Sequence, residues 1–390
     1  MIKIQYRKVD KENNLVSFDN TLELSEFRKL FLKLKKEGFI ELSKDIKFSD
    51  KDLKTFISAT KLHLNENSTI FTDNFKILKM LDNNDPAKRI LVIDNHNFFH
   101  RLFHAMPRMV NDEGKTVTLL KALSNFLKWF FNTQSEKYSN IIFTSEGLNL
   151  YRKQSTKDTD YPYKANRSET DPELKEQIKD CETFLEENGF LILSEYGYEA
   201  DDMLASIASS FSEINIPVTA FTSDKDAYQL ATIDTFQIMD PKSKESNLAK
   251  DLIEDKFGVT PELFVDYQGI VGDTADNVPG IKGFGGKIAA STLKEYGSIE
   301  GIYENISRVG LEQIEEGSKI TKAKQASADK KQAKWIENKD ILLISRDLCR
   351  LRRHLIKDKD LIKILQQSKL PNEQTILMLK DSFSEKGVVF

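Results

Sequence analysis

The sequence predicts an α/β protein with a mostly parallel central sheet that helices cover on both faces. Two observations carry this prediction. Apolar runs of strand length, the first at residues 90–93, alternate with helical patterns through the middle of the chain. Apolar residues make up 39% of the 390 residues, which is enough for a sizeable core. Strands separated by helices pair in parallel, because the crossover helix returns the chain to the same end of the sheet.

Each predicted strand except the last is followed by a helix. The strands are expected at residues 90–93, 140–144, 190–193 and 218–222, and the helices at 117–131, at 172–187 and from about 199 onward. The strand at 218–222 is expected to close the series. Functional groups of such sheets gather beyond the carboxyl ends of the strands, so the residues that follow each strand are the first candidates for a site.

Four segments are expected along the chain. Residues 1–86 form a small accessory α+β unit that ends in a turn-rich sequence at 82–86. Within it, Ile2–Val9 and residues 14–18 predict a β-hairpin, and apolar residues spaced three and four apart over 24–34 predict an amphipathic helix. Residues 87–259 carry the predicted sheet, residues 260–300 hold a glycine-rich turn that opens a helix, and residues 301–390 are mostly helical, with a Lys/Ala segment at 318–334.

Composition excludes several classes of protein. The apolar runs are far shorter than the ~20 residues of a membrane span. The N-terminus lacks the apolar core of a signal peptide, so a cytoplasmic protein is expected. Cys181 and Cys349 fall in predicted helices without metal-ligand spacing, which argues against disulfides and zinc sites. The 57 basic and 61 acidic residues nearly cancel, and this balance neither predicts nor excludes a nucleic-acid partner.

Acidic residues follow three of the predicted strands and recur in a later loop. They are Asp94, then Glu199, Asp201 and Asp202 in GYEADD, then Asp224 and Asp226 in SDKD, then Asp273 and Asp276 in GDTADNVPG. Each group alone is also typical of a helix cap or a first helical turn. An extended chain would point Asp224 and Asp226 the same way, and a helical one would place Asp273 and Asp276 one turn apart.

The shared location of these acids predicts a metal site. The acids that follow the parallel strands meet at one edge of the sheet, where crowded carboxylates repel one another unless a cation lies between them. Magnesium prefers oxygen ligands, usually carboxylates together with water and phosphate. Two such ions roughly 4 Å apart activate a water molecule and stabilise the leaving oxygen in phosphodiester cleavage. Neither a Ser/His/Asp pattern nor a Walker loop competes with this interpretation.

Two further segments suit a nucleic acid. Basic and aromatic residues alternate over 151–153 and 161–167, a composition typical of single-strand binding and equally of a solvated loop. The sequence GIKGFGGKIA at 280–289 is a glycine-rich turn that opens a helix, whose first N–H groups can bind an anion. A helix-hairpin-helix contact with a DNA phosphate fits this turn better than nucleotide binding does.

From about residue 89 to residue 298 the chain resembles the flap endonuclease and 5′-3′ exonuclease family, which includes phage exonucleases and the nuclease domain of bacterial DNA polymerase I. The matching motifs, in the family's order, are VIDNHNFFHRLFHAMP, YKANR, GYEADD, SDKDAYQL, GDTADNVPG and GIKGFGGKIA. The resemblance implies a PIN-like 5′ nuclease domain over 87–259 with a helical arch at about 150–189, a helix-hairpin-helix region over 260–300, and a C-terminal helical region that packs on the nuclease domain.

The resemblance also assigns roles to residues of this sequence. Asp94, Glu199, Asp201 and Asp202 would hold one Mg²⁺, and Asp224, Asp226, Asp273 and Asp276 a second, with Mn²⁺ as a substitute and K⁺ at the helix-hairpin-helix. Lys164, Arg167 and Arg152 would contact the region of the scissile phosphate, and Tyr163, Gly283, Gly285, Gly286 and Lys287 would bind DNA.

One position departs from the family pattern in a way that affects the metal site. The family normally has an Asp seven residues before the arginine that matches Arg152, and here that position is Ser145. Glu146 is adjacent and longer, but neighbours on a strand face opposite ways, so it would reach the metal only if the strand has ended. Asn95 replaces a usual glycine and His100 a usual aromatic residue. Weakened catalysis is expected rather than none, because water can fill an open Mg²⁺ position.

The sequence therefore predicts a Mg²⁺-dependent 5′ nuclease that stands alone, without a polymerase, and resembles phage replication nucleases that remove flaps or RNA primers. Its expected partners are DNA with a 5′ flap, nick or gap, an RNA primer–DNA hybrid, and replication proteins bound through residues 1–86. The alternative is a junction-binding protein of the same fold that has lost the chemistry. Retention of the other acids favours the enzyme, because like charges crowded without metal cost stability.

Overall fold

The structure, a computed structural model, describes residues 2–9, 15–22, 88–213, 216–312, 319–357 and 360–390. Near the N-terminus, β1 (Ile2–Val9) pairs antiparallel with β2 (Leu15–Leu22) along the whole length of both strands, which confirms the predicted hairpin. The amphipathic helix expected over 24–34 and the break expected at 82–86 lie outside the described residues.

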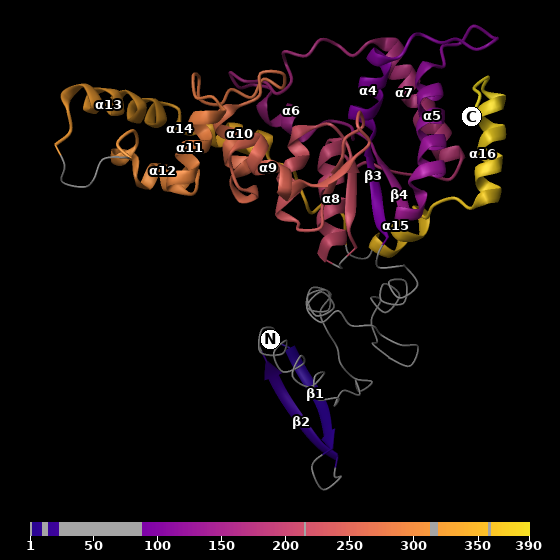
Figure 1. Cartoon of the computed structure of the whole chain (residues 1–390), viewed down its shortest axis with the longest axis horizontal. Helices are drawn as coiled ribbons and strands as arrows, with labels where there is room; N and C mark the ends of the chain where they lie inside the picture. The colour runs from indigo at the N-terminus through magenta and orange to yellow at the C-terminus, as the bar shows by residue number, and fades with distance from the viewer. Residues whose placement is uncertain (1, 10–14, 23–87, 214–215, 313–318, 358–359) are drawn as a thin grey trace.

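A six-stranded sheet forms the centre of the described chain (Figure 1). Its strands are β3 (Arg89–Asp94), β4 (Tyr138–Thr144), β5 (Leu191–Leu193), β6 (Val218–Phe221), β7 (Gln237–Met239) and β8 (Ser246–Leu248), in the spatial order β5-β4-β3-β6-β7-β8. All neighbours are parallel except β8, which runs antiparallel to β7. The mostly parallel sheet is confirmed. The series does not close at β6, because β7 and β8 follow it. The sequence did not predict these two strands, since each has only 3 residues, too few for a periodic pattern to be recognised.

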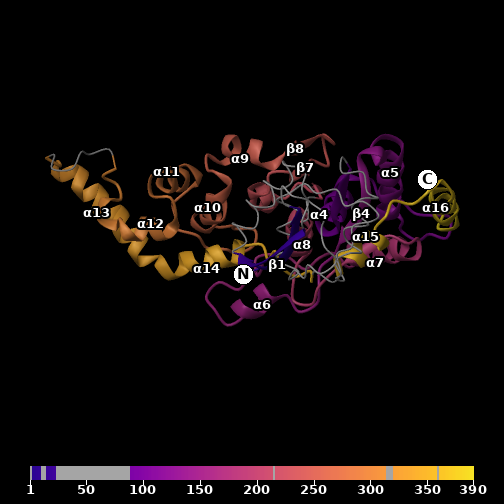
Figure 2. The ribbon, with the colours of Figure 1, turned by 90° about the horizontal axis from the view of Figure 1, so that it is seen from below.

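The strand β3 separates two hydrophobic cores. Ile90 and Val92 face one core while Leu91 and Ile93 face the other, as the alternation of a strand requires. The first core is covered by α8 (Ala200–Glu213), α9 (Ala249–Phe257) and α10 (Phe264–Val271), and the second by α4 (Asn95–Ala105), α5 (Thr118–Thr133), α7 (Pro172–Glu187) and α16 (Glu373–Glu385) (Figures 1 and 2). Helices therefore cover both faces of the sheet, as expected.

The helices agree with the predicted ones, with one addition and one correction. The helices α5, α7 and α8 match those expected at 117–131, at 172–187 and from about 199. The helix α4 was not expected, because Asp94 ends β3 and caps α4 at once, without a turn sequence between them. Of the arch expected to be helical over about 150–189, α6 (Tyr151–Thr156) and α7 are helical, but residues 157–171, all of them described, contain no helix. The short 3₁₀ helices are η1 (Ser135–Lys137), η2 (Lys225–Thr232), η3 (Pro261–Leu263) and η4 (Ile306–Arg308).

The C-terminal part is mostly helical, as predicted. The helices α11 (Gly286–Tyr296), α12 (Ile299–Glu304), α13 (Lys322–Glu337) and α14 (Lys339–Cys349) extend to one side of the sheet, and α15 (Leu361–Gln367) and α16 return to it (Figure 1). The Asn140 amide of β4 donates to the Leu365 carbonyl of α15 (2.8 Å), and the rings of Phe184 in α7 and Phe383 in α16 lie 4.2 Å apart. These contacts attach the last two helices to the sheet.

In the part of the chain that the structure describes, no helix combines the length and the apolar character needed to cross a membrane. Cys181 is buried in α7 and Cys349 is buried at the end of α14, and both are free thiols. The helical placement predicted for both cysteines is confirmed.

Candidate active site

A cavity of about 360 Å³ opens beyond the carboxyl ends of β3 and β6. In the sheet, β3 and β6 are neighbours, and the chain continues from β3 to β4 on one side and from β6 to β7 on the other. Ligands of α/β sheets bind at such a change in the direction of the strand order. The acidic lining is Asp94, Glu146, Glu199, Asp201, Asp224, Asp226 and Asp276, and the basic lining includes Arg101, Lys164 and Arg167. Acids from distant parts of the sequence therefore converge at one edge of the sheet, as expected of residues that follow parallel strands.

Asp94 joins β3 to the cavity. It is the N-cap of α4, where its Oδ1 accepts a hydrogen bond from the backbone N–H of Asn97 (3.1 Å). The residue is only 4% exposed. Burial raises the pKa of Asp94 to about 7, and the charges of Asp224 and Glu146 add to the rise. Asp94 is thus both a helix cap and a part of the cavity wall.

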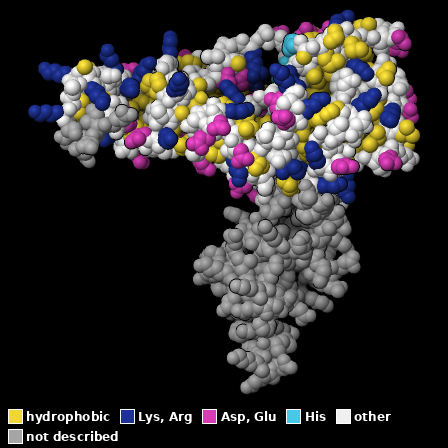
Figure 3. All heavy atoms as spheres, in the orientation of Figure 1, with side chains coloured by type: hydrophobic (Ala, Val, Ile, Leu, Met, Phe, Trp, Pro, Cys, Tyr) yellow, Lys and Arg dark blue, Asp and Glu magenta, His cyan; other side chains and the backbone are white. Residues whose placement is uncertain are grey.

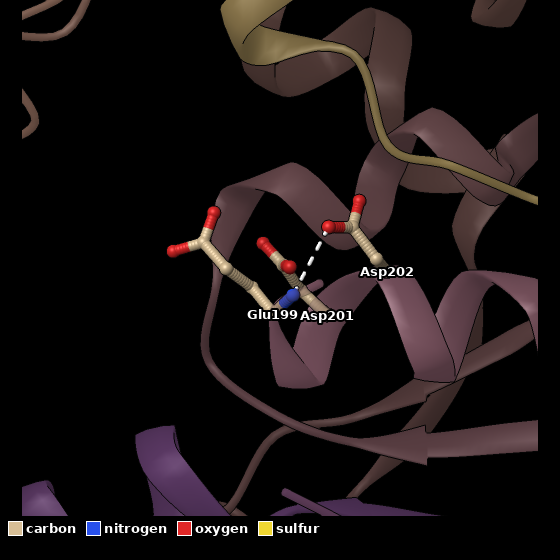
Figure 4. A group of neighbouring side chains, drawn as sticks. All are labelled: Glu199, Asp201 and Asp202. Atoms are coloured by element: carbon tan, nitrogen blue, oxygen red, sulfur yellow. Dashed lines mark hydrogen bonds between the residues drawn. The ribbon is translucent and has the colours of Figure 1, made fainter. Parts of the chain in front are cut away.

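The GYEADD segment places three carboxylates around the start of α8 (Figure 4). One oxygen each of Glu199, Asp201 and Asp202 lies within 4.8 Å of the other two. Asp201 Oδ1 is buried and meets no hydrogen-bond donor among the described residues. Burial, with the charges of Asp202 and Glu199, raises the pKa of Asp201 well above its usual value. A buried carboxylate oxygen without a donor is suited to a cation, which would satisfy it.

Asp202 differs from Asp201 because donors saturate both of its oxygens. These oxygens accept hydrogen bonds from the two terminal nitrogens of Arg152 (2.7 Å each) and from the backbone N–H groups of Glu199 (3.2 Å) and Arg352 (2.9 Å). Arg152 also donates to Glu199 Oε2 (2.6 Å) and to the Arg350 carbonyl (2.8 Å). The structure therefore gives Arg152 a different place from the expected phosphate contact, since all of these partners are inside the protein and the residue is only 4% exposed.

The SDKD segment begins a 3₁₀ helix and is not extended. The strand β6 ends at Phe221, and Asp224 is the N-cap of η2, where its Oδ1 accepts from the Asp226 N–H (2.9 Å). Both carboxylates nevertheless line the cavity. Asp226 Oδ1 accepts a hydrogen bond from Gln268 Nε2 of α10 (2.5 Å), while burial and the charge of Asp224 raise the pKa of Asp226 to about 7. The capping interpretation of this segment is confirmed for Asp224, and the chain continues from it as a 3₁₀ helix and not as an extended strand.

The GDTADNVPG loop is a turn, so the helical backbone that would place its two acids one turn apart is not present. An antiparallel bridge joins Asp273 to Val278. Gly272 (φ +73°) and Gly280 (φ +57°) flank the turn, and a Cβ on either would lie 2.6 Å from backbone atoms of the facing segment. Asp273 pairs with Lys225 (2.8 Å) outside the cavity lining, whereas Asp276 lies in the lining. Glycine is therefore needed at both ends of this turn, where the two backbones approach closely.

Two basic side chains from the segment before α7 face the acids. Lys164 forms an ion pair with Glu199, and Arg167 forms one with Asp276, with 2.8 Å between Arg167 Nε and Asp276 Oδ1. The backbone N–H of Lys164 also donates to the Asp276 carbonyl (2.8 Å). This segment is therefore fixed to the GDTADNVPG loop, and it brings both cations into the cavity.

Tyr163 does not present the stacking face that was expected of a DNA-binding residue. Its ring is only 8% exposed and packs in a small cluster with Leu348 and Cys349. Its hydroxyl lies between Glu199 Oε2 (3.1 Å) and Asp276 Oδ2 (3.2 Å). Because a buried ring cannot stack on a base, the contribution of Tyr163 to the site is to bridge these two acids.

The predicted hairpin lies between α10 and α11. Gly283 has a φ of +85°, Gly285 is the N-cap of α11, and Gly286 and Lys287 begin that helix. The first N–H groups of a helix have no partner within the helix and attract anions. Lys and Arg side chains also project from the end of the molecule formed by α12 and α13 (Figure 3). This end of the protein is suited to a polyanion.

A lysine from another helix already contacts the hairpin. Lys334 of α13 donates from Nζ to the Lys282 carbonyl (2.7 Å), and its ammonium lies 5.3 Å from the centre of the Phe284 ring. The same ammonium would be 2.9 Å from a Cβ built on Gly283, but it ends a flexible side chain that can move aside, so the positive φ of Gly283 and not a lack of space favours glycine there.

Sequence reasoning missed the part that α4 plays in the cavity. His96, His100 and His104 recur every four residues along α4 and line the cavity, and the rings of His96 and His100 are 4.1 Å apart. Burial lowers the pKa of His96 and of His100 to about 4, so both are neutral at pH 7. The four-residue spacing of histidines in HNFFHRLFH was the signal available in the sequence.

The raised pKa values of Asp94 and Asp226 predict how the metal-free protein responds to pH. In the folded protein both carboxyl groups hold a proton up to about pH 7, whereas their ordinary pKa is 3.8. The folded state therefore binds more protons between these values, and the contribution of both groups to the free energy of unfolding falls as pH rises from about 4 to 7. A divalent cation needs the ionised form, so we expect Mg²⁺ to raise the melting temperature more at pH 8 than at pH 6. Thermal unfolding with Mg²⁺ and with EDTA at both pH values measures this, and an equal effect of Mg²⁺ would contradict it.

Two family models match consecutive parts of the chain. The N-terminal, resolvase-like domain of 5′-3′ exonucleases matches residues 89–258, and the C-terminal SAM fold of 5′-3′ exonucleases matches residues 259–370. A 5′-3′ exonuclease of Aquifex aeolicus is 30% identical over 286 residues, which cover 73% of this chain and 95% of that protein. The thermostable DNA polymerase I of Thermus thermophilus is 30% identical over 232 residues, which cover 60% of this chain. The chain spans only about a quarter of such polymerases, 27% in this case.

Two solved structures of bacteriophage T5 proteins share the fold. The T5 flap endonuclease in a complex with DNA and metal ions superposes with a TM-score of 0.52 at 18% identity, over 77% of this chain and 99% of that one. The T5 5′-exonuclease with bound zinc ions gives a TM-score of 0.51 at 18% identity, over 77% of this chain and 100% of that one. At this identity the likeness concerns the fold alone.

Proposed function

This chain belongs to the 5′-3′ exonuclease family, and from that premise we propose that it is a structure-specific 5′ nuclease. It hydrolyses phosphodiester bonds at the 5′ ends or flaps of DNA, or of RNA primers paired with DNA. The observation that carries the proposal is the convergence of acids from separate segments on one cavity, beside the cations of Lys164 and Arg167. Buried acids with raised pKa values cost folding stability, so a purely structural role does not explain them.

The donor set of the cavity fits divalent cations, and Mg²⁺ is the proposed ion, with Mn²⁺ as a substitute. Carboxylates are the ligands that Mg²⁺ prefers, and Asp201 Oδ1 is a buried oxygen that lacks a donor among the described residues. When bound, two such ions supply an activated water and a stabilised leaving oxygen. The proposed ligands are Asp94, Glu199 and Asp201 for one ion and Asp224, Asp226 and Asp276 for the other, while Asp202 and Asp273 position Arg152 and Lys225.

The basic residues of the cavity have two distinct tasks. Lys164 and Arg167 bind the scissile phosphate, exchanging their contacts with Glu199 and Asp276 for contacts with phosphate oxygens. Arg152 stays inside the protein, where its hydrogen bond to Glu199 Oε2 (2.6 Å) keeps that carboxylate turned toward the cavity. Lys164 and Arg167, which line the cavity, thus bind the substrate, whereas the buried Arg152 holds the acids in place.

Cleavage of a labelled 5′-flap duplex tests the function. We expect the full chain to cut the flap strand near the junction in Mg²⁺ and to bind without cutting in EDTA. Wild type is compared with Ser145→Asp, which restores the acid that the family normally has. Wild type that binds the flap but never cuts it in Mg²⁺ would establish the junction-binding alternative instead, whether or not Ser145→Asp cuts.

The hairpin is proposed to hold duplex DNA through Lys287, an exposed residue at the start of α11. Replacing Lys287 with alanine removes one phosphate contact, so we expect weaker binding to any duplex and a slope of log affinity against log salt that is smaller by about 1. Lys363→Ala, an exposed lysine on α15, is the control and should leave both quantities unchanged. Fluorescence anisotropy at several salt concentrations gives affinity and slope together. An unaltered slope for Lys287→Ala would remove Lys287 from the interface.

The cellular setting is proposed from the relatives. The match to bacterial DNA polymerases I favours a role in replication, in a bacterial or phage-infected cytoplasm. The proposed partner is DNA with a 5′ flap, nick or gap, since the T5 flap endonuclease was solved with DNA. A replication protein is proposed as the partner of residues 1–86. A potassium ion at the helix-hairpin-helix is proposed as well, as the family resemblance implies.

A further inference from the structure

The position at which this chain departs from its family, Ser145, does not line the cavity, whereas the next residue, Glu146, does. We propose that Glu146 supplies the carboxylate that Ser145 lacks, as a ligand of the divalent cation next to Asp94. This inference rests on the proposed function and deepens it, because it changes the ligand set of the same site.

Ser145 faces away from the cavity. Its backbone N–H donates to the Leu193 carbonyl (3.0 Å), and its hydroxyl donates to Glu182 Oε1 of α7 (2.5 Å). The Asn95 amide donates to the same oxygen (3.4 Å). An aspartate at position 145 would therefore meet the Glu182 carboxylate at close range, and two like charges there would repel each other. In this chain, position 145 is built to hold a carboxylate of α7 and not to supply one.

Glu146 faces the cavity, one residue further on. The strand β4 ends at Thr144, so the alternation that would turn Glu146 away from Asp94 no longer applies. Glu146 lines the cavity together with Asp94, Asp201 and Asp224. Its Oε1 lies 3.6 Å from Nε2 of the neutral His96, which is longer than a hydrogen bond. The side chain is 34% exposed, and it is accessible to a hydrated ion.

The loop that carries Glu146 is held firmly by the segment that leads into α8. The Gly147 N–H donates to the Tyr198 carbonyl (2.9 Å), and the Gly197 N–H donates to the Leu148 carbonyl (2.8 Å). A Cβ on Gly147 would lie 1.8 Å from the Glu195 carbonyl oxygen, so only glycine allows the two backbones to approach this closely. Because the same segment continues into Glu199, the positions of Glu146 and Glu199 are set by one set of backbone contacts. A rigidly placed carboxylate is what a metal site requires.

Metal binding and cleavage by the full chain test this assignment. Glu146→Gln keeps the shape of the side chain and removes its charge, and we expect it to weaken Mn²⁺ binding in titration calorimetry by roughly 10- to 100-fold. The Mg²⁺ concentration that gives half-maximal flap cleavage should rise by a similar factor. Glu195→Gln, an exposed glutamate on the adjoining loop, is the matched control, and Ser145→Ala tests the family position itself. Both should bind Mn²⁺ as wild type does.

The outcomes separate this inference from the proposed function. Wild-type Mn²⁺ affinity in Glu146→Gln, or a loss in Ser145→Ala as large as the loss in Glu146→Gln, would overturn the assignment of Glu146. If the wild type cuts no flap yet Glu146→Gln still loses Mn²⁺ affinity, the ligand assignment stands and the nuclease proposal fails. Melting temperatures measured in EDTA show that each variant is folded, and Glu146→Gln should not lie below wild type, because it removes a negative charge from an acidic cavity.

Discussion

Replacing Asp201 with asparagine is expected to slow flap cleavage in Mg²⁺ by roughly 10³-fold, which corresponds to about 4 kcal/mol of transition-state stabilisation. Asparagine keeps the size of the side chain and removes the charge that a divalent cation requires. Asp201 is the acid for which this loss is clearest, since its buried Oδ1 has no donor in the described part of the chain. Single-turnover cleavage of a labelled flap duplex measures the change.

The same variant should become more stable in the absence of metal. Asp201 is crowded by Asp202 and Glu199, and burial with these charges raises its pKa well above the usual value. Removing one of the crowded charges relieves the repulsion, so the free energy of unfolding in EDTA at pH 8 is expected to rise. Asp255→Asn, at an exposed position of α9, is the control for both measurements. Cleavage by Asp201→Asn at the wild-type rate would show that Asp201 does not act in the chemistry.

Replacing Arg152 with alanine is expected to lower the free energy of unfolding by about 3–5 kcal/mol, because breaking a buried ion pair leaves its acids uncompensated. Arg152 is only 4% exposed, and it donates to Glu199 (2.6 Å) and to both oxygens of Asp202 (2.7 Å each). Urea unfolding at pH 7 in EDTA measures the loss. Arg108→Ala is the matched control: this arginine pairs with Glu173 at the surface with its side chain 66% exposed, and such pairs contribute at most about 1 kcal/mol.

The pH dependence of the Arg152 effect follows from Glu199. The cations Lys164 and Arg152 outweigh burial and hold the pKa of Glu199 below its ordinary value of 4.5. A depressed pKa contributes stability that is present above pH 4.5 and lost as pH falls through the lower folded value. The difference between wild type and Arg152→Ala should therefore be largest above about pH 5 and should narrow in acid. A difference that stays constant from pH 7 to pH 4 would show that lost packing, and not charge, accounts for the effect.

Local sequence patterns predicted those parts of the fold that depend on neighbouring residues. The runs of β3 and β4 are long and apolar because both strands lie between two layers of helices, so their composition alone marked them as strands. The helix α7 was predicted at its observed bounds, since a Pro at its start and a regular apolar spacing identify it. The strands β7 and β8, with 3 residues each, were missed because a period cannot be recognised over so short a stretch.

Features of the site that depend on distant partners could not be predicted in this way. Tyr163 has the composition of a stacking residue in an exposed basic loop, yet its ring is buried against residues of α14. Ser145 looks like a lost ligand in the sequence, and only the position of α7 shows that its hydroxyl is bound to Glu182. In both cases the deciding neighbour lies far along the chain, and neither propensity nor spacing carries information about it.

The sequence by itself determined the family, and it determined that the acids which follow the strands converge on one edge of the sheet. The second point follows because parallel strands place their carboxyl ends together wherever the connecting helices lie. Only the tertiary structure decided what each acid does there. Asp201 and Asp202 are adjacent and chemically identical, but the backbone N–H of Arg352 and the guanidinium of Arg152 satisfy Asp202, while Asp201 Oδ1 stays without a donor among the described residues. The physical reason is that a carboxylate's role depends on which donors reach it, and these donors come from parts of the chain that folding alone brings together.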